Sequence, residues 1–182
     1  KLGYEVEYQA FPVPDQYIGS ISFSMYGEKD WQVGAASNAF ISTNPVVGSV
    51  VFIGKETNIN SLSESIHGKI VLLEQADTIE KYNEQVENVA IKGAKGVLLY
   101  STIGDRGNYG EAFNPVLKKK QSIPVFGLAY NQGIRMKEKV LHNHNVVSLK
   151  AKQEVNLRSL NVIAKKKPKH TTGDEEVTIM SA

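Results

Sequence analysis

The chain has 182 residues, of which 41% are hydrophobic and 22% are charged, and its formal net charge is only +2. This composition is ordinary for a soluble globular protein, and the length suits one domain or one domain with part of another. The weak net charge gives no general attraction to nucleic acid, the absence of cysteine excludes disulfides, zinc fingers and thiol catalysis, and no apolar run approaches the ~20 residues of a membrane helix.

Strand patterns dominate the first part of the chain. Residues 4–11 alternate between apolar and polar side chains, which is typical of a half-buried strand, and Pro12 then prevents its extension. Residues 21–27 alternate in the same way, and residues 46–54 are rich in β-branched side chains. Residues 69–75 contain a continuous apolar run at 70–73, which is typical of a strand buried on both faces.

The hydrophobic period then changes to that of a helix. Between residues 79 and 90 the apolar side chains recur at intervals of three and four, with charged side chains between them. Asp77 or Thr78 can accept hydrogen bonds from the first-turn amides, and Gly93 can end the helix in a left-handed conformation. Another buried strand, residues 96–100, follows at once. The three elements predict a right-handed, parallel βαβ unit.

The second half begins with a long stretch that shows no periodicity. Residues 101–122 hold three glycines and one proline, which predicts a long loop. Residues 123–128 predict a short strand, and residues 131–143 predict a second helix with Asn131 as its N-cap. Alternation over residues 146–155 predicts a further strand, and two more hydrophobic strands joined by a charged loop end the chain.

Several motifs are rejected on their spacing. Residues 48–55 resemble a phosphate-binding loop, but five residues separate the glycines instead of four, and the lysine ends a strand instead of opening a helix. His142 and His144 lack a clear third ligand nearby, so we interpret them as exposed residues at a helix end. The lysine runs at 118–120 and 165–169 have no interleaved aromatic residues, which favours solvated loops. No Ser, His or Asp lies in a recognisable nucleophile motif.

The order of elements resembles that of the protease-associated (PA) domain family. The matching pieces are Gly68-Lys69-Ile70 opening a buried strand, Asn88 ahead of Gly93-Ala94, Gly96-Val97 entering the next strand, Ile123-Pro124-Val125 after a variable loop, and Gly133 in the second helix. The resemblance covers about residues 17–150. It implies an α/β fold, the PA-type swivelling β/β/α domain, with a β-rich barrel-like core, a βαβ unit and two main helices.

Both ends of the chain resemble the flanks of the PA domain in secreted, co-catalytic zinc aminopeptidases of the aminopeptidase Y-like type. In that family the PA domain is inserted near the start of the peptidase domain, and the strand that matches residues 175–182 leads directly into His-x-Asp, the first metal-ligand motif. The resemblance implies a peptidase-domain strand in residues 1–14, a PA domain in residues 15–155 and the truncated start of the zinc peptidase domain in residues 156–182. Since the chain has neither an initiator methionine nor a signal peptide, we expect it to be an internal piece of a longer protein.

The resemblance implies a non-catalytic PA domain that shapes substrate access to its parent enzyme or binds substrate or partners. The parent would be a secreted or cell-surface bacterial metallopeptidase, a hydrolase with two zinc ions. For this chain we expect no cofactor, no catalytic or metal-ligating residue, no membrane span and no nucleic-acid partner. Its expected partners are the parent peptidase domain and peptide substrate, and its exposed flank strands predict self-association.

Three other interpretations stay open. The same PA domain occurs in subtilisin-like serine proteases, although the terminal strands favour the zinc family. A free-standing PA binding module is the second alternative, and the residues that follow Ala182 in the parent would distinguish it. A small α/β enzyme complete in itself is the third, and the absence of a catalytic constellation in the sequence argues against it.

The long loop carries the candidate binding site. Residues 103–121 combine glycines with Arg106, Tyr109, Phe113 and a lysine triplet. Glycine lets a backbone rearrange, aromatic side chains provide contact area at a low entropic cost, and Arg106 can bind a carboxylate. The hypothesis is that this loop forms part of the rim over the parent's substrate cleft. The alternative is a plain surface loop.

Overall fold

The computed structural model describes residues 4–24, 29–41, 44–55, 57, 66–101, 112–142, 145–166 and 177–181. The chain divides into two compact units. Tyr17–Gln153 forms the larger unit, whose described residues include a strand barrel and the helices α2 and α3. Lys1–Gln16 and Glu154–Ala182 form the smaller unit, whose three strands we call the terminal sheet.

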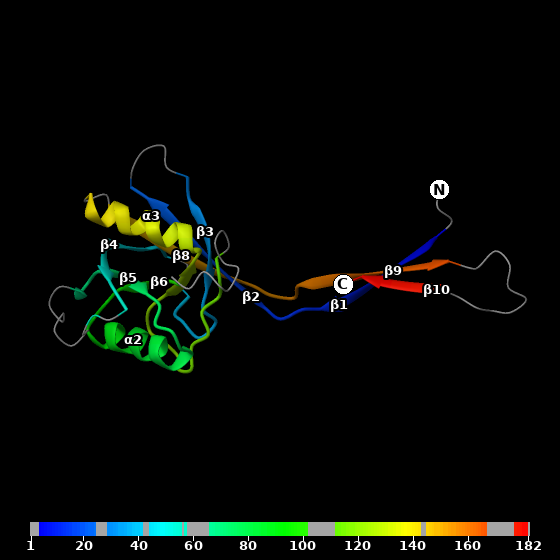
Figure 1. The fold of residues 1–182 in the computed structure, drawn as a ribbon, viewed down its shortest axis with the longest axis horizontal. Coiled ribbons are helices and arrows are strands. Elements are labelled where there is room, and N and C mark those ends of the chain that lie inside the picture. The colour runs from blue at the N-terminus through cyan, green and yellow to red at the C-terminus, as the bar shows by residue number, and fades with distance from the viewer. Residues whose placement is uncertain are drawn as a thin grey trace, which may run out of the picture. The chain divides into compact units, whose positions relative to one another are not determined.

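Seven strands close into a barrel in the order β2-β3-β7-β6-β5-β4-β8 (Figure 1). Neighbouring strands from β4 to β7 run parallel, whereas β3 pairs antiparallel with β2 and β7, and β8 pairs antiparallel with β4. The strand bounds are Gln16–Phe23 for β2, Trp31–Ala35 for β3, Val46–Ile53 for β4, Ile70–Glu74 for β5, Gly96–Tyr100 for β6, Val125–Leu128 for β7 and Val146–Glu154 for β8.

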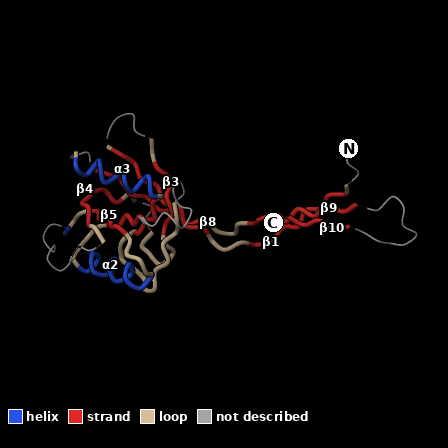
Figure 2. The backbone as a smooth tube through the Cα atoms, in the orientation of Figure 1, coloured by secondary structure: helices blue, strands red, loops and turns tan. Residues whose placement is uncertain are grey.

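Two helices lie on opposite sides of the parallel strands (Figures 1 and 2). Helix α2 spans Ile79–Ile91 and helix α3 spans Tyr130–Leu141. Strands β5 and β6 are buried on both faces, which explains their continuous apolar sequences. Alternate residues of these strands join two separate hydrophobic clusters, one shared with Met136 of α3 and the other with Val86 and Val89 of α2. This mixed α/β barrel with its βαβ unit confirms the expected fold.

The ends of α2 lie where the sequence predicted them. The Thr78 hydroxyl accepts a hydrogen bond from the Lys81 amide at 3.3 Å and so caps the first turn. Beyond the last turn, Gly93 has a φ of +82°, a left-handed conformation that favours glycine. Local sequence alone therefore defines this helix at both ends.

Two sequence predictions were wrong in detail. Asn131 does not cap α3, because Ala129 holds the N-cap position and its amide donates to Gln132 Oε1 at 2.9 Å. Strand β2 spans Gln16–Phe23 and so begins five residues before the predicted start at residue 21, while residues 25–27 of the prediction lie outside the described residues. In addition, β3 was not predicted, since it is only five residues long and ends in Gly34 and Ala35, which give little β signal.

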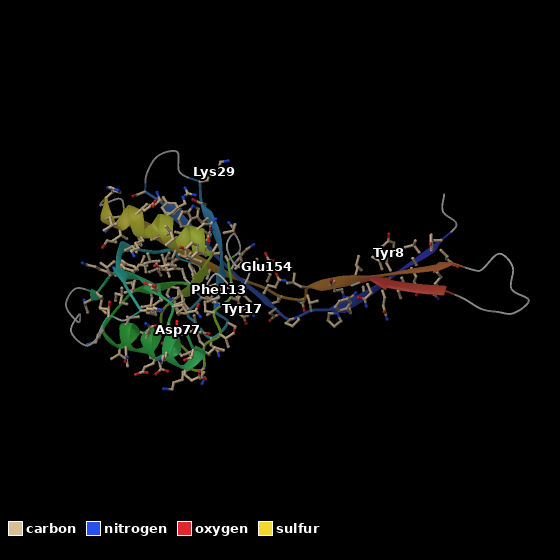
Figure 3. The ribbon with its side chains drawn as sticks, viewed as in Figure 1. Tyr8, Tyr17, Lys29, Asp77, Phe113 and Glu154 are labelled. Carbon is tan, nitrogen blue, oxygen red and sulfur yellow. The ribbon has the colours of Figure 1, made fainter. Side chains whose placement is uncertain are left out.

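The terminal sheet has the order β1-β9-β10, with both pairs antiparallel. Its strands are Glu5–Pro12 for β1, Arg158–Lys166 for β9 and Val177–Ser181 for β10. Tyr8 of β1 faces Val162 of β9 in the register and is 65% exposed (Figure 3). Val6 and Leu160, which share that face by strand alternation, are 49% and 53% exposed. This unit therefore presents an apolar sheet face that no described residue covers.

None of the helices in the described part of the chain is long and apolar enough to cross a membrane.

Candidate functional site

The parallel strands bring their carboxyl ends to one edge of the barrel. Glu74 and Tyr100 are register partners at the last positions of β5 and β6, and Tyr100 also pairs with Leu128 at the end of β7. Ligands of open parallel sheets bind beyond such an edge, because loops from several strands converge there. The predicted loop leaves the barrel at this edge, directly after β6.

Tyr100 is the most buried ionisable group at this edge, with 1% of its surface exposed. Burial raises the pKa of its phenol to about 12, and the nearby Glu74 and Tyr130 act in the same direction. Its ring packs against Gly133 of α3 so closely that a Cβ at position 133 would collide with it. Tyr100 therefore stays neutral at physiological pH and joins α3 to the strand edge by packing.

Polar contacts tie the loops after β4 and β5 together. The Ala76 amide donates to Gln85 Oε1 at 3.2 Å, and Gln85 Nε2 donates to the Lys55 carbonyl oxygen at 3.2 Å. Lys55 Nζ lies 3.5 Å from Asp77 Oδ1. Lys55 is the residue that ended the apparent phosphate-binding motif. Here it follows strand β4 and pairs with an acid, which fits the rejection of that motif.

Residues 112–118 form a structured segment that we call the strap. At one end the Phe113 carbonyl oxygen lies directly over Gly34 and Gly127, which are register partners in β3 and β7. The Phe113 ring is half-buried against the hydrophobic cluster below α2. Asn114 Nδ2 donates to the Tyr17 carbonyl oxygen at 3.1 Å, and Figure 3 labels Phe113 and Tyr17. The strap thus crosses the seam between β3 and β7 and reaches β2.

The other end of the strap is fixed to α2. The Tyr82 hydroxyl donates to the Val116 carbonyl oxygen at 2.8 Å, and Asn83 Nδ2 donates to the same oxygen at 3.0 Å. Asn83 Oδ1 accepts from the Lys118 amide at 2.8 Å. Leu117 is buried among the residues of the α2 cluster. This half of the predicted loop is therefore packed in place by side chains of the helix.

Two residues of the lysine triplet form ion pairs with α2. Lys118 Nζ lies 2.8 Å from Glu80 Oε1, and Lys119 Nζ lies 3.0 Å from Glu87 Oε2. The hydrogen bond from Lys118, a backbone hydrogen bond and the lysine charge hold the pKa of the Glu80 carboxyl below its usual value. These pairs are solvent-accessible, so they orient the strap more than they stabilise it.

The structure describes one of the three residues proposed for the loop. Phe113 lies in the strap, whereas Arg106 and Tyr109 lie outside the described residues. The sequence reasoning missed Gly34 and Gly127, on which the strap rests. Lone glycines inside strands are a known signal that another backbone approaches closely, but the signal does not say which one.

The described residues do not assemble a metal centre. No three or more His, Asp or Glu side chains among them come together in a group that could hold a metal ion. His142 is the C-cap residue of α3 and is exposed, which fits the interpretation of a helix end, and His144 lies outside the described residues.

Comparison with known proteins gives two kinds of match. The family model of the PA domain matches residues 32–136. Among solved structures, the zinc aminopeptidase BSAP from Bacillus subtilis is 26% identical, with a TM-score of 0.61 over 91% of this chain and 38% of that chain. An aminopeptidase from Aneurinibacillus sp. strain AM-1 is 23% identical, with a TM-score of 0.52 over 93% of this chain and 40% of that one.

A protease of another class shares the fold. The subtilisin-like protease Apa1 from the Antarctic psychrotroph Pseudoalteromonas sp. AS-11 is 15% identical, with a TM-score of 0.51 over 80% of this chain and 35% of that chain. A search of the curated proteins found no match. The chain spans about two fifths of the length of the aminopeptidases to which it is similar.

Proposed function

The chain belongs to the PA domain family, and from this premise we propose that it is the non-catalytic PA domain of a secreted bacterial zinc aminopeptidase. The supporting observation is the extent of the match to the Bacillus subtilis enzyme. That match covers 91% of the chain, which is more than Tyr17–Gln153 can supply, so it must include part of the terminal sheet. The likeness therefore extends beyond the barrel, into the flanks that we attribute to the peptidase domain.

The terminal sheet supports the parent peptidase domain as a partner. Val6, Tyr8 and Leu160 expose an apolar sheet face, and exposed apolar surfaces of this kind mark an interaction site. We attribute residues 1–14 and 156–182 to the parent's peptidase domain, whose remaining chain would cover this face. In the absence of that chain, the outer edges of β1 and β10 would pair with a second copy, which is the self-association that we propose.

Within the parent, the proposed role is to shape access of peptides to the active site. The loop with Arg106, Tyr109 and Phe113 begins at the carboxyl edge of the parallel strands, and the strap in its second half is held by Asn83 of α2. A guanidinium can bind a peptide carboxylate, and aromatic rings provide contact area for side chains. The loop would then favour some peptide lengths or sequences over others.

The test of this role replaces Arg106, Tyr109 and Phe113 with alanine in the intact parent enzyme. We expect kcat/KM for a longer peptide to change by more than about twofold relative to kcat/KM for a dipeptide. The matched control is Lys95→Ala, which removes an exposed charge outside the loop, just before the amino-terminal end of β6. If both substrates change by less than about twofold, under ~0.4 kcal/mol, the loop has no part in selection.

We propose that two zinc ions belong to the parent's peptidase domain and that this chain contributes no ligand. The described residues offer no fitting donor set, so no catalytic step is assigned to them. Isothermal titration of the isolated chain with zinc should give no stoichiometric binding below micromolar concentration, and aminoacyl substrates should not be hydrolysed. Tight one-to-one binding of zinc would overturn this assignment.

The second candidate is the PA domain of a subtilisin-like serine protease, which the likeness to Apa1 supports at the level of the fold. The residues that follow Ala182 in the parent distinguish the two. A His-x-Asp motif there supports the zinc enzyme, and its absence favours the serine protease or a free-standing module.

A further inference from the structure

We infer that Gly34 and Gly127 are positioning residues that hold the chain at Phe113 and thereby orient its side chain for substrate selection. The inference rests on the proposed function, in which Phe113 takes part in selection. It concerns residues that carry no side chain of their own and that lie in two different strands of the barrel.

The two glycines face each other across the junction of β3 and β7. Their register is antiparallel, with Gly34 opposite Gly127 and Ala35 opposite Phe126. Glycine weakens a strand interior because it has no side chain to pack, so a facing pair of glycines needs a structural reason. The reason here is space, since the strap crosses the strand pair at this point.

A Cβ added at either position would meet the same atom. At both Gly34 and Gly127 the nearest obstruction is the Phe113 carbonyl oxygen, at a separation that real Cβ atoms do not adopt. The obstruction is backbone, which cannot rotate away as the end of a flexible side chain can. Alanine at either position therefore requires the strap to lift from the barrel or the strands to separate.

The same geometry fixes the Phe113 ring. A Cβ at Gly127 would also lie 3.1 Å from Phe113 Cδ1, so the ring rests beside the glycine as well as on the α2 cluster. Asn114, the next residue, is hydrogen bonded to Tyr17, and Asn83 holds the strap at Lys118. With both sides anchored, lifting the strap at Phe113 changes the direction of its side chain.

The test compares Gly34→Ala with Gly48→Ala, a matched control in a strand of the same barrel. A Cβ at Gly48 would make only ordinary van der Waals contacts, the nearest of them with the Ile70 side chain at 3.4 Å. Asn114→Ala is a milder second variant, because it removes the bond to Tyr17 without placing an atom between the strap and the strands. In the chain itself, the readout is the nuclear Overhauser effect between the Phe113 ring protons and the Gly127 α-protons.

We expect this nuclear Overhauser effect to disappear in Gly34→Ala, to weaken in Asn114→Ala and to persist in Gly48→Ala. In the intact parent, Gly34→Ala should shift the ratio of kcat/KM for a longer peptide to that for a dipeptide by at least about threefold, through KM, while kcat for the dipeptide is unchanged. The same shift should follow Phe113→Ala.

The outcomes separate the inference from the proposed function. If the ring of Phe113 stays beside Gly127 in Gly34→Ala and Asn114→Ala, the glycines do not position Phe113 and the inference is wrong. It is equally wrong if Phe113→Ala changes the substrate ratio while Gly34→Ala moves the ring away from Gly127 and leaves that ratio unchanged. If Phe113→Ala itself leaves the ratio unchanged, the proposed role of Phe113 in selection fails, while the nuclear Overhauser effect still decides whether the glycines hold the strap at Phe113.

Discussion

At the scale of single residues, Asn83 makes an unusually complete set of polar contacts. It is 5% exposed, donates to the carbonyl oxygens of Ile79 and Val116, and accepts from the Lys118 amide. Asn83→Ala would leave the Lys118 amide without that acceptor, so we expect unfolding to become easier by about 2 kcal/mol in urea titration. Lys119→Ala, which removes only an accessible ion pair, should cost less than about 1 kcal/mol. Equal losses would show that Asn83 is not the anchor of the strap.

Tyr100 gives the barrel a dependence on alkaline pH. The folded-state pKa of its phenol is about 12, above the ordinary value of 10.0, so the unfolded chain ionises first as the pH rises. The stability that this neutral group contributes is complete below pH 10 and is lost between pH 10 and about 12. Tyr100→Phe should therefore show a shallower loss of unfolding free energy between pH 10 and about 12 than the unaltered chain. If the slope of unfolding free energy against pH is the same in Tyr100→Phe and in the unaltered chain, the raised pKa of Tyr100 is not the cause of this pH dependence.

At the scale of elements, α3 depends on a close approach to the sheet. Helix propensity alone predicts that Gly133→Ala stabilises the helix by about 1 kcal/mol. Since the new methyl group would collide with the buried Tyr100 ring, we expect instead a net loss of about 2 kcal/mol or more in thermal or chemical unfolding.

Asn131→Ala, in the first turn of α3, is the control for this prediction. Because Asn131 is not the N-cap, its replacement should change the unfolding free energy by no more than about 0.5 kcal/mol. A gain in stability for Gly133→Ala would mean that the helix can move away from β6.

Sequence patterns predicted the elements whose determinants are local. Helix α2 has its cap, its apolar stripe and its terminal glycine within one stretch of chain, and β5 and β6 show burial on both faces in their own residues. Strand β3 and the pair of glycines under the strap could not be predicted in this way. Gly34 and Gly127 come together only when β3 pairs with β7 in the barrel, so the sequence around one glycine gives no information about the other.

At the scale of the whole molecule, we expect the barrel unit to fold without the terminal sheet. The barrel of Tyr17–Gln153 has its own hydrophobic clusters. A chain trimmed to residues 15–155 should therefore unfold cooperatively, at a temperature close to that of the full chain, when followed by the fluorescence of Trp31. It should also associate less in analytical ultracentrifugation, because the exposed face of the terminal sheet has been removed. A much lower unfolding temperature for the trimmed chain would show that the ends belong to the barrel's core.

The hydrogen bond between Tyr17 and Gln153 bears on the order in which the protein is made. Gln153 Nε2 donates to the Tyr17 hydroxyl at 3.1 Å, so the first and last residues of the barrel unit are held together once it has folded. Strand β1 emerges early from the ribosome, but its partner β9 is synthesised only after the whole barrel. A barrel that folds first shortens the loop that this pairing must close, which lowers the entropic cost by on the order of 3 kcal/mol. A barrel that folded on its own between two partner strands would thus leave those strands able to find each other.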